Sequence, residues 1–292
     1  MKLATLHVDG ATTPAVVSRE EDVFWTVEQL TGRRLPDMLD LIRAYGSLRD
    51  ALVPTEPGRA LSQARIAAPL KPPRNVMCVG KNYHAHAREF TRSGFDSSAK
   101  DASEAIPTAP IIFTKAPETV IGPDQDIRYP TGLSEQLDYE AELGVVIGKQ
   151  AKGVSKAQAL DHVFGYVIIN DMTARDLQAK HKQWFLGKSL DTFCPMGPWL
   201  VTADEIGNAN LELKCWVNGE LRQHANARDL IFDVPTLIET LSAGLTLLPG
   251  DVIATGTPAG VGIGFSPPRF LVRGDEVAIE ISRLGRLVNR IA

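Results

Sequence analysis

Short apolar segments separated by glycine and proline make up most of the chain after residue 110. Such segments, bounded by turn-forming residues, are typical of β-strands. Six of them are predicted strands: Ile111–Phe113, Ala141–Ile147, Val163–Ile169, Leu211–Val217, Val252–Ala254 and Val277–Ile281. The Asn218-Gly219 pair predicts a hairpin turn. Because the strands do not alternate regularly with helices, the pattern predicts a β-rich α+β fold and not a repeated βαβ unit.

A few segments between the strands favour helices. They are Pro36–Arg43, where the proline is expected at an early helical position, Tyr83–Phe90, Lys156–Asp161 and Val234–Ala243. The polar stretch from Thr91 to Thr108 shows no clear period, and we expect it to form a mobile lid.

Three prolines within Pro69–Pro73 predict a stiff, extended linker. The residues before it include strand-like segments and the predicted helix at Pro36–Arg43. We therefore expect a small N-terminal domain over residues 1–70 and a larger domain over residues 71–292.

Composition excludes several classes of protein. The 292 residues carry 31 Lys and Arg against 35 Asp and Glu, a net charge of −4, so no basic excess is available to bind nucleic acid. The most apolar run, Val163–Ile169, is far shorter than the roughly 20 residues that span a bilayer. His7 and Asp9 interrupt any signal peptide, and three widely spaced cysteines favour neither a disulfide framework nor a zinc site. We expect a soluble, cytoplasmic protein.

Two glycine-containing motifs resemble nucleotide-binding loops but lack parts that such loops need. After Gly260–Gly264 come Pro267 and Pro268, where a dinucleotide-binding turn needs the start of a helix. Gly187-Lys188-Ser189 resembles the end of a phosphate-binding loop, but Lys182 stands where that motif requires glycine. The chain also contains no GxSxG nucleophile motif. Nucleotide binding and serine hydrolysis therefore have no support.

Acidic residues at the ends of two predicted strands form the strongest local signal. Glu140 and Glu142 are two residues apart, so they share one face of a strand. Asp171 follows the apolar run that begins at Val163, and the tip of a buried strand commonly lines a binding crevice. An exposed strand face is the alternative explanation for the two glutamates. Three carboxylates without His or Cys predict an all-oxygen site for Mg²⁺ or Mn²⁺, with Ca²⁺ as a further option.

A histidine and a glutamate on the helix predicted at Tyr83–Phe90 form a second signal. His86 and Glu89 are three residues apart, so their side chains lie on the same side of a helix. A histidine oriented by a carboxylate is the usual form of a general base, whereas a surface ion pair is the simpler alternative. His84 faces another side and has no matching partner.

Lys188 and the Thr255–Gly260 loop allow two interpretations each. Lys188 lies in an apolar setting, where it either extends to the surface or neutralises an anionic substrate near the acidic residues. The loop is either an ordinary turn or a binding site for a carboxylate, made of hydroxyls and main-chain amides.

Taken in order, these motifs resemble those of the fumarylacetoacetate hydrolase superfamily. The resemblance covers roughly residues 69–290. The matching stretches are Asn82-Tyr83 with His86 and Glu89, Asp138–Leu143, Asn170–Gln178, Gly187–Thr192, Gly197–Trp199, Val217–Glu220, Leu248–Asp251 and Thr255–Gly262.

The resemblance implies a fold, an assembly and a set of roles. The implied fold is a catalytic domain of mixed β-strands rolled around the active site, in a homodimer. The resemblance implies that Glu140, Glu142 and Asp171 bind Mg²⁺ or Mn²⁺. It also implies that His86 and Glu89 form a catalytic dyad on a lid helix. Positions that contact substrate in the family are matched by Lys188, Gln178 and Thr257, and Arg175 matches the arginine of the larger hydrolase.

Two departures from the family pattern concern the substrate. The stretch Val79–His84 contains no acid, whereas the larger, tyrosine-catabolic hydrolase has a fourth carboxylate ligand there. The chain therefore resembles the smaller branch with three carboxylates. The polar stretch from Thr91 to Thr108 is longer than usual, which affects the lid and the size of the substrate.

The reaction implied first is hydrolysis of a carbon–carbon bond in a 2,4-dioxo acid, giving pyruvate and a second carboxylic acid. A divalent ion would act as a Lewis acid toward a chelating 2-oxo acid, and His86 would activate the attacking water. The alternatives are decarboxylation of an oxaloacetate-type acid and isomerisation of an unsaturated 2-oxo dioate. A protein that binds metal or ligand without turnover is a further alternative, which an intact His86, Glu89 and Lys188 disfavour.

Overall fold

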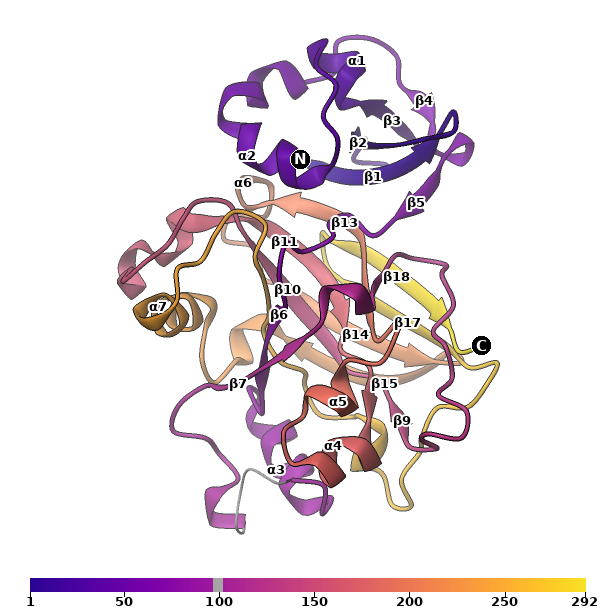
Figure 1. Ribbon diagram of the computed structural model, residues 1–292, viewed down its shortest axis with the longest axis vertical. Helices are drawn as coiled ribbons and strands as arrows, with labels where there is room; N and C mark the ends of the chain where they lie inside the picture. The colour runs from indigo at the N-terminus through magenta and orange to yellow at the C-terminus, as the bar shows by residue number, and fades with distance from the viewer. Residues whose placement is uncertain (97–101) are drawn as a thin grey trace.

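A large mixed sheet forms the centre of the computed structural model, which describes residues 1–96 and 102–292 (Figure 1). Its main path runs β4-β3-β2-β1-β13-β11-β10-β16-β6-β7, with β5 paired to β1 and β8 paired to β13. Its strands are β1 (Lys2–Val8), β2 (Ala11–Val17), β3 (Val23–Thr26), β4 (Arg59–Ala60), β5 (Arg65–Ala67), β6 (Val76–Gly80), β7 (Ile111–Lys115), β8 (Val120–Ile121), β10 (Ala141–Ile147), β11 (Val163–Asn170), β13 (Cys194–Thr202) and β16 (Val252–Ala254).

A second sheet, of four strands, packs against one face of the first. It consists of β14 (Glu212–Val217), β15 (Glu220–Asn226), β17 (Glu276–Ile281) and β18 (Gly285–Arg290), in the order β15-β14-β17-β18. The core between the sheets joins residues such as Leu143 and Ile168 to Leu213 and Ile279. A separate pair, β9 (Leu137–Asp138) and β12 (Thr173–Ala174), lies beside the ends of β10 and β11. The prediction of a β-rich mixed fold is confirmed.

Helices cover the other face and one end of the large sheet. The α-helices are α1 (Val27–Thr31), α2 (Met38–Leu48), α3 (His84–Arg92), α4 (Arg175–His181), α5 (Phe185–Lys188), α6 (Ala203–Ile206) and α7 (Val234–Gly244). Short 3₁₀-helices span Arg49–Leu52, Leu61–Gln63, Ala102–Glu104, Pro117–Thr119, Lys156–His162, Ala227–Asp229 and Gly262–Gly264. Leu237, Ile238 and Leu241 of α7 pack on Val145 and Ile253 of the sheet. Among the described residues, no helix has the length and hydropathy needed to cross a bilayer.

Some details differ from what the sequence predicts. Asp37 is the N-cap of α2 and accepts a hydrogen bond from the Asp40 amide, so Pro36 lies outside the helix. The helix predicted over Lys156–Asp161 forms as a 3₁₀-helix. The predicted hairpin is present, and Asn218 and Gly219 have the positive φ values of 50° and 79° that its tight turn needs. Within the predicted polar lid, α3 extends to Arg92, and residues 97–101 lie outside the described residues.

The N-terminal segment continues the large sheet. Strand β1 pairs with β13, with Lys2 opposite Val201 and Leu3 opposite Leu200. Residues of α2 share a core with Val146 and Phe164. The division at residue 70 therefore stays a prediction, although Figure 1 shows residues 1–67 gathered at one end of the molecule.

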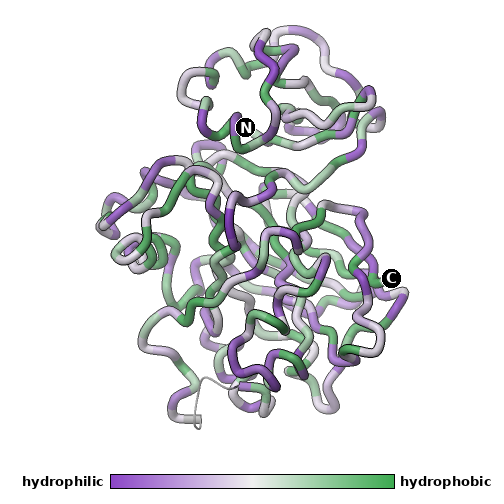
Figure 2. Tube along the Cα trace, in the orientation of Figure 1, coloured by the Kyte–Doolittle hydropathy of each residue, from purple (hydrophilic) through white to green (hydrophobic). Residues whose placement is uncertain are grey.

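Strand ends and helices meet at the opposite end, below the large sheet in Figure 1. Helices α3, α4 and α5 lie there, close to β7, β9 and β15. Figure 2 shows hydrophobic stretches along the interior strands and hydrophilic ones in outer turns and helices. Polar side chains buried inside this end of the molecule depart from that pattern, and they require hydrogen-bond or ion-pair partners.

Candidate functional site

Three carboxylates meet at the ends of β10 and β11. Ala141 pairs with Asn170, so Glu140, one residue before β10, lies beside Asp171, one residue after β11. Glu142 lies within β10. One oxygen from each of the three side chains lies within 4.8 Å of the others, and the residues are 4%, 1% and 0% exposed. The exposed strand face that the sequence left open is thereby excluded.

Two fully buried cations contact Glu140 of this group. Lys188 Nζ lies 2.7 Å from Glu140 Oε2 and 2.9 Å from Asp171 Oδ2. Arg175 Nη2 lies 2.6 Å from Glu140 Oε1. Burial raises the pKa of Glu140, but the charges of Lys188 and Arg175 outweigh burial and lower it to about 2. Of the two interpretations of Lys188, extension to the surface is excluded, because the residue is 1% exposed.

Glu142 has a different environment. Within the described residues it has no ion-pair partner, and its Oε2 accepts a hydrogen bond of 2.9 Å from the amide of Gly256. Burial raises the pKa of Glu142 well above its ordinary value, and the charges of Asp171 and Glu140 raise it further. Glu142 is therefore the carboxyl of this group whose ionised form is the most disfavoured without a bound cation.

The three residues fit a hard divalent cation. The acidic centre has four buried acids, Asp138, Glu140, Glu142 and Asp171, and the three buried bases that pair with them, Lys115, Arg175 and Lys188. The acids outnumber these bases by one. Burial and the charges of Asp171 and Glu140 disfavour the ionised form of Glu142, so a bound cation would stabilise it. An all-oxygen donor set with unbalanced negative charge is the environment that Mg²⁺ or Mn²⁺ occupies in proteins.

The sequence analysis missed Lys115, at the end of β7. Its side chain is completely buried, and Nζ donates to Asp171 Oδ1 at 2.6 Å, to the carbonyl of Met172 at 3.0 Å and to the carbonyl of Lys188. A lysine two residues after the apolar run Ile111–Phe113 is the signal that could have shown it, by the same argument that was applied to Asp171. Lys115 joins β7, the turn after β11 and the end of α5.

Replacement of Lys115 by methionine is expected to destabilise the protein by about 3–5 kcal/mol, since it leaves Oδ1 of the buried Asp171 and two buried carbonyls without their donor. Urea unfolding monitored by circular dichroism measures the change. The control is Lys149→Met at an exposed position, for which a change within about 0.5 kcal/mol is expected. Equal midpoints for the two variants would show that the Lys115 contacts contribute nothing.

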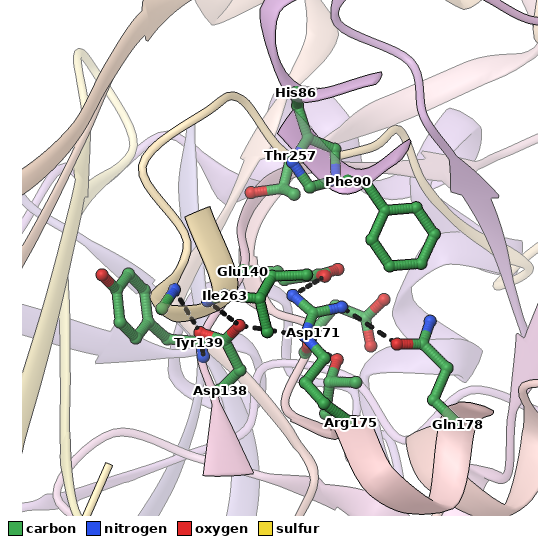
Figure 3. A network of polar contacts seen from close by, with 12 residues as sticks. His86, Phe90, Asp138, Tyr139, Glu140, Asp171, Arg175, Gln178, Thr257 and Ile263 are labelled. Carbon is green, nitrogen blue, oxygen red and sulfur yellow. Dashed lines mark hydrogen bonds and ion pairs between the residues drawn. The ribbon is translucent and has the colours of Figure 1, made fainter. Parts of the chain in front are cut away.

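Arg175 lies between two acids, as Figure 3 shows. Its Nε is 2.9 Å from Asp138 Oδ2, and its Nη1 donates to Gln178 Oε1 at 3.1 Å. The sequence resemblance assigns Arg175 and Gln178 to substrate, a role that stays a prediction. The structure gives Arg175 a second role, because it holds Asp138 and Glu140 together.

Helix α3 carries the predicted dyad over the site. His86 Nδ1 lies 3.1 Å from Glu89 Oε2, and His86 is 4% exposed, so the pair is not an ordinary surface ion pair. Gly264 lies so close that a β-carbon there would stand 1.9 Å from Glu89 Oε1. His84 is exposed on another side of α3, as predicted.

Main-chain amides of one loop, residues 256–264, bind three acids of the site. Gly256 donates to Glu142, Gly260 donates to Glu89 Oε1 at 3.0 Å, and Gly262 and Ile263 donate to Asp138 at 2.7 and 3.1 Å. Glycine-rich loops commonly bind anions through their amides. Here the anions are the protein's own carboxylates.

A small cleft connects these parts. Its empty volume is about 270 Å³. It is lined by Val79, Gly80, Lys81, His86, Phe90, Phe113, Glu140, Glu142, Arg175, Gln178, Trp184, Lys188 and Thr257. Seven of the nine predicted site residues line it, while Glu89 and Asp171 lie behind His86 and Lys188 and contact them. The sequence did not single out Lys81, Phe90, Phe113 or Trp184.

Comparison with known proteins identifies the family. Residues 75–292 match the family model described as fumarylacetoacetate (FAA) hydrolase C-terminal. The chain belongs to the fumarylacetoacetate hydrolase family. It is 52% identical over 235 residues to the oxaloacetate tautomerase YisK of Bacillus subtilis, which covers 80% of this chain and 74% of that protein.

Solved structures of the fumarylacetoacetate hydrolase family have the same fold. The fumarylacetoacetate hydrolase of Exiguobacterium antarcticum has a TM-score of 0.85 and 39% identity, covering 100% of this chain and 99% of that one. A maleylpyruvate hydrolase from Sphingobium sp. SYK-6, in complex with manganese(II) and pyruvate, has a TM-score of 0.80 and 33% identity, with the same coverage. The named members are enzymes, and their names include hydrolases and tautomerases.

Proposed function

We propose that this protein is a Mg²⁺- or Mn²⁺-dependent tautomerase that interconverts the keto and enol forms of a short 2-oxo dicarboxylic acid, oxaloacetate first. The observation that carries the proposal is the buried carboxylate group of Glu140, Glu142 and Asp171, which shares one cleft with His86. The 52% identity to a protein named oxaloacetate tautomerase supports the choice of reaction.

The size of the cleft supports a small substrate. The empty volume of about 270 Å³ includes space that is open to solvent, so the room between the lining side chains suits only a small molecule. A four-carbon acid suits such a space. Phe90, Phe113 and Trp184 supply an apolar wall that excludes water from the reacting carbon.

The roles of the residues follow from their contacts. A divalent ion held by Glu140, Glu142 and Asp171 would supply Lewis acidity toward the 2-oxo group. A carboxylate only accepts hydrogen bonds, so His86 donates Nδ1–H to Glu89, and Nε2 is the atom that takes the proton from C3. The 2-oxo oxygen is then protonated, by the imidazolium or by water, which gives the enol, and the reverse steps return the proton to C3. Lys188 adds positive charge beside the cleft, where the substrate oxygen becomes negative.

A carbon–carbon hydrolase of 2,4-dioxo acids is the second candidate. The same His86–Glu89 pair has the form of a base that activates water, and a maleylpyruvate hydrolase is a structural neighbour. In that reaction, water adds to C4, the C3–C4 bond breaks, and C3 receives a proton. Tautomerisation needs only the transfer of a proton between C3 and the 2-oxo oxygen.

A substrate panel tests the two candidates. Metal-free protein is reloaded with Mg²⁺ or Mn²⁺ and mixed with oxaloacetate, acylpyruvates or unsaturated 2-oxo dioates, with chelator as the control. Faster enolisation of oxaloacetate, followed by ultraviolet absorbance, with unchanged composition by NMR, is the expected result. Pyruvate and an acid from an acylpyruvate would favour the hydrolase, and CO₂ from oxaloacetate would favour a decarboxylase. No enolisation above the chelator control would contradict the proposal.

The contacts described for the carboxylates, the dyad and the cations are made within a single copy of the chain. The homodimer that the sequence resemblance implies stays a proposal, which light scattering after gel filtration tests.

A further inference from the structure

We infer that Lys81 binds the second carboxylate of the substrate and thereby selects 2-oxo dicarboxylates over 2-oxo monocarboxylates. The inference rests on the proposed function, in which a 2-oxo acid is held at the carboxylate group. It concerns a residue to which neither the sequence motifs nor the contacts of the acidic centre assign a role.

Three side chains with permanent positive charge line the cleft: Lys81, Arg175 and Lys188. Arg175 and Lys188 hold the acidic centre, since their ion pairs are with Asp138, Glu140 and Asp171. The ion pair of Lys81 is with Asp96, outside that centre. Lys81 is therefore the cleft cation whose charge is not used to hold metal ligands.

The backbone at Lys81 is held in an unusual conformation. Its φ of 56° lies in the left-handed region, which is uncommon for a residue with a side chain. The next residue, Asn82, fixes this turn because its carboxamide donates to the carbonyls of Thr255 and Phe232 and accepts from the Phe232 amide. Strained conformations that neighbouring contacts enforce are concentrated at functional sites.

Asp96 holds the Lys81 ammonium group inside the protein through an ion pair. Lys81 Nζ lies 2.7 Å from Asp96 Oδ2, which also accepts from Thr91 Oγ1 at 2.6 Å, and both charged side chains are 2% exposed. An ammonium group has three donors on a flexible stem, so it contacts a second carboxylate while it keeps the first.

The chemistry of a dicarboxylate requires such a cation. The carboxylate next to the 2-oxo group is taken up at the acidic centre, and the other one enters a cleft whose remaining wall includes Val79, Phe113 and Trp184. A carboxylate buried against apolar groups without a cation is strongly disfavoured. Lys81 supplies that positive charge. A monocarboxylate has a methyl group at the same position, and its binding gains nothing from the charge of Lys81.

A matched pair of ligands tests the inference without turnover. 2-Oxobutanoate has a methyl group where oxaloacetate has its second carboxylate, and calorimetry on Mn²⁺-loaded protein gives the Kd of each. In Lys81→Met, oxaloacetate is expected to bind at least about tenfold more weakly, while 2-oxobutanoate changes by less than about threefold. Lys81→Arg retains the charge and should retain most of the preference.

The variant Asp96→Asn distinguishes recognition of the substrate by Lys81 from a structural role of the Lys81–Asp96 pair in anchoring α3. This variant breaks the ion pair and leaves the cation, so we expect the preference for oxaloacetate to persist or increase. Equal weakening of both ligands in Lys81→Met and Asp96→Asn would show that the pair only anchors α3, and would overturn the inference. So would an unchanged ratio of the two Kd values in Lys81→Met and Lys81→Gln. Wild-type protein that discriminates between the ligands without enolising oxaloacetate would contradict the proposed function alone.

Discussion

Replacing Glu142 by glutamine is expected to abolish metal-dependent activity without making the metal-free protein less stable. Glu142 is a metal ligand in the proposed site, and its loss is expected to lower kcat/KM by at least about 1,000-fold, equivalent to ~4 kcal/mol. In the metal-free protein burial and the charges of Asp171 and Glu140 raise the pKa of Glu142 and so disfavour its ionised form, and a neutral glutamine is expected to cost no stability there. Glutamine still accepts the hydrogen bond from Gly256.

Glu140→Gln is the matched comparison. It removes the same charge from the same group, but Glu140 pairs with Lys188 and Arg175, which would both lose a buried partner. We expect this variant to lose activity and also about 3–5 kcal/mol of stability. Urea unfolding in chelator and Mn²⁺ calorimetry measure both effects. The charge assignment fails if Glu142→Gln is the less stable of the two, and the metal assignment fails if either variant binds Mn²⁺ as wild type does.

His86→Gln is expected to lower kcat by about 10²–10⁴-fold, the usual contribution of a general base, with Mn²⁺ affinity unchanged. His86 lies against Glu89 and lines the cleft, but it contacts none of the three carboxylates through a hydrogen bond or ion pair described here. His84→Gln, on the exposed side of the same helix, is the control and should behave as wild type. Enolisation at the wild-type rate in His86→Gln would exclude this histidine as the base.

The same variant separates the alternative reactions. Hydrolysis of a 2,4-dioxo acid needs a water activated by His86, so it should be lost along with tautomerisation. Decarboxylation needs no attacking water, and it would survive the change. A variant that still releases CO₂ from oxaloacetate would therefore indicate decarboxylation as a separate activity of the site.

Local sequence patterns were sufficient for the six strands predicted after residue 110 and for the acidic residues, but they missed other strands, such as β13 and β18. Glu140 and Glu142 were found because a strand repeats every two residues, and Asp171 because it follows an apolar run. The pair of His86 and Glu89 follows from helical spacing in the same way. Each of these inferences depends on residues that are close in the chain.

The cations could not be placed from the sequence. Lys115 contacts Asp171 and the carbonyl of Lys188, which are 56 and 73 residues away, and no local period encodes such distances. Arg175 was assigned to substrate by resemblance, and only the tertiary structure shows that it also holds Asp138 and Glu140. Lys81 and Asp96 have an equally nonlocal relation to the carboxylates.

The loop of residues 256–264 has a consequence for how such sites diversify. Because its contacts to Glu142, Glu89 and Asp138 come from main-chain amides, exchanging side chains at the non-glycine positions of the loop leaves those donors in place. The glycines themselves are exceptions, since a β-carbon at Gly264 would collide with Glu89, and one at Gly260 or Gly262 would collide with a main-chain carbonyl. Evolution is thus free to remodel the cleft wall, for instance at Thr257, while the positions of the acids are inherited unchanged. A fold of this kind can acquire new substrates by small steps without first losing the chemistry that it already has.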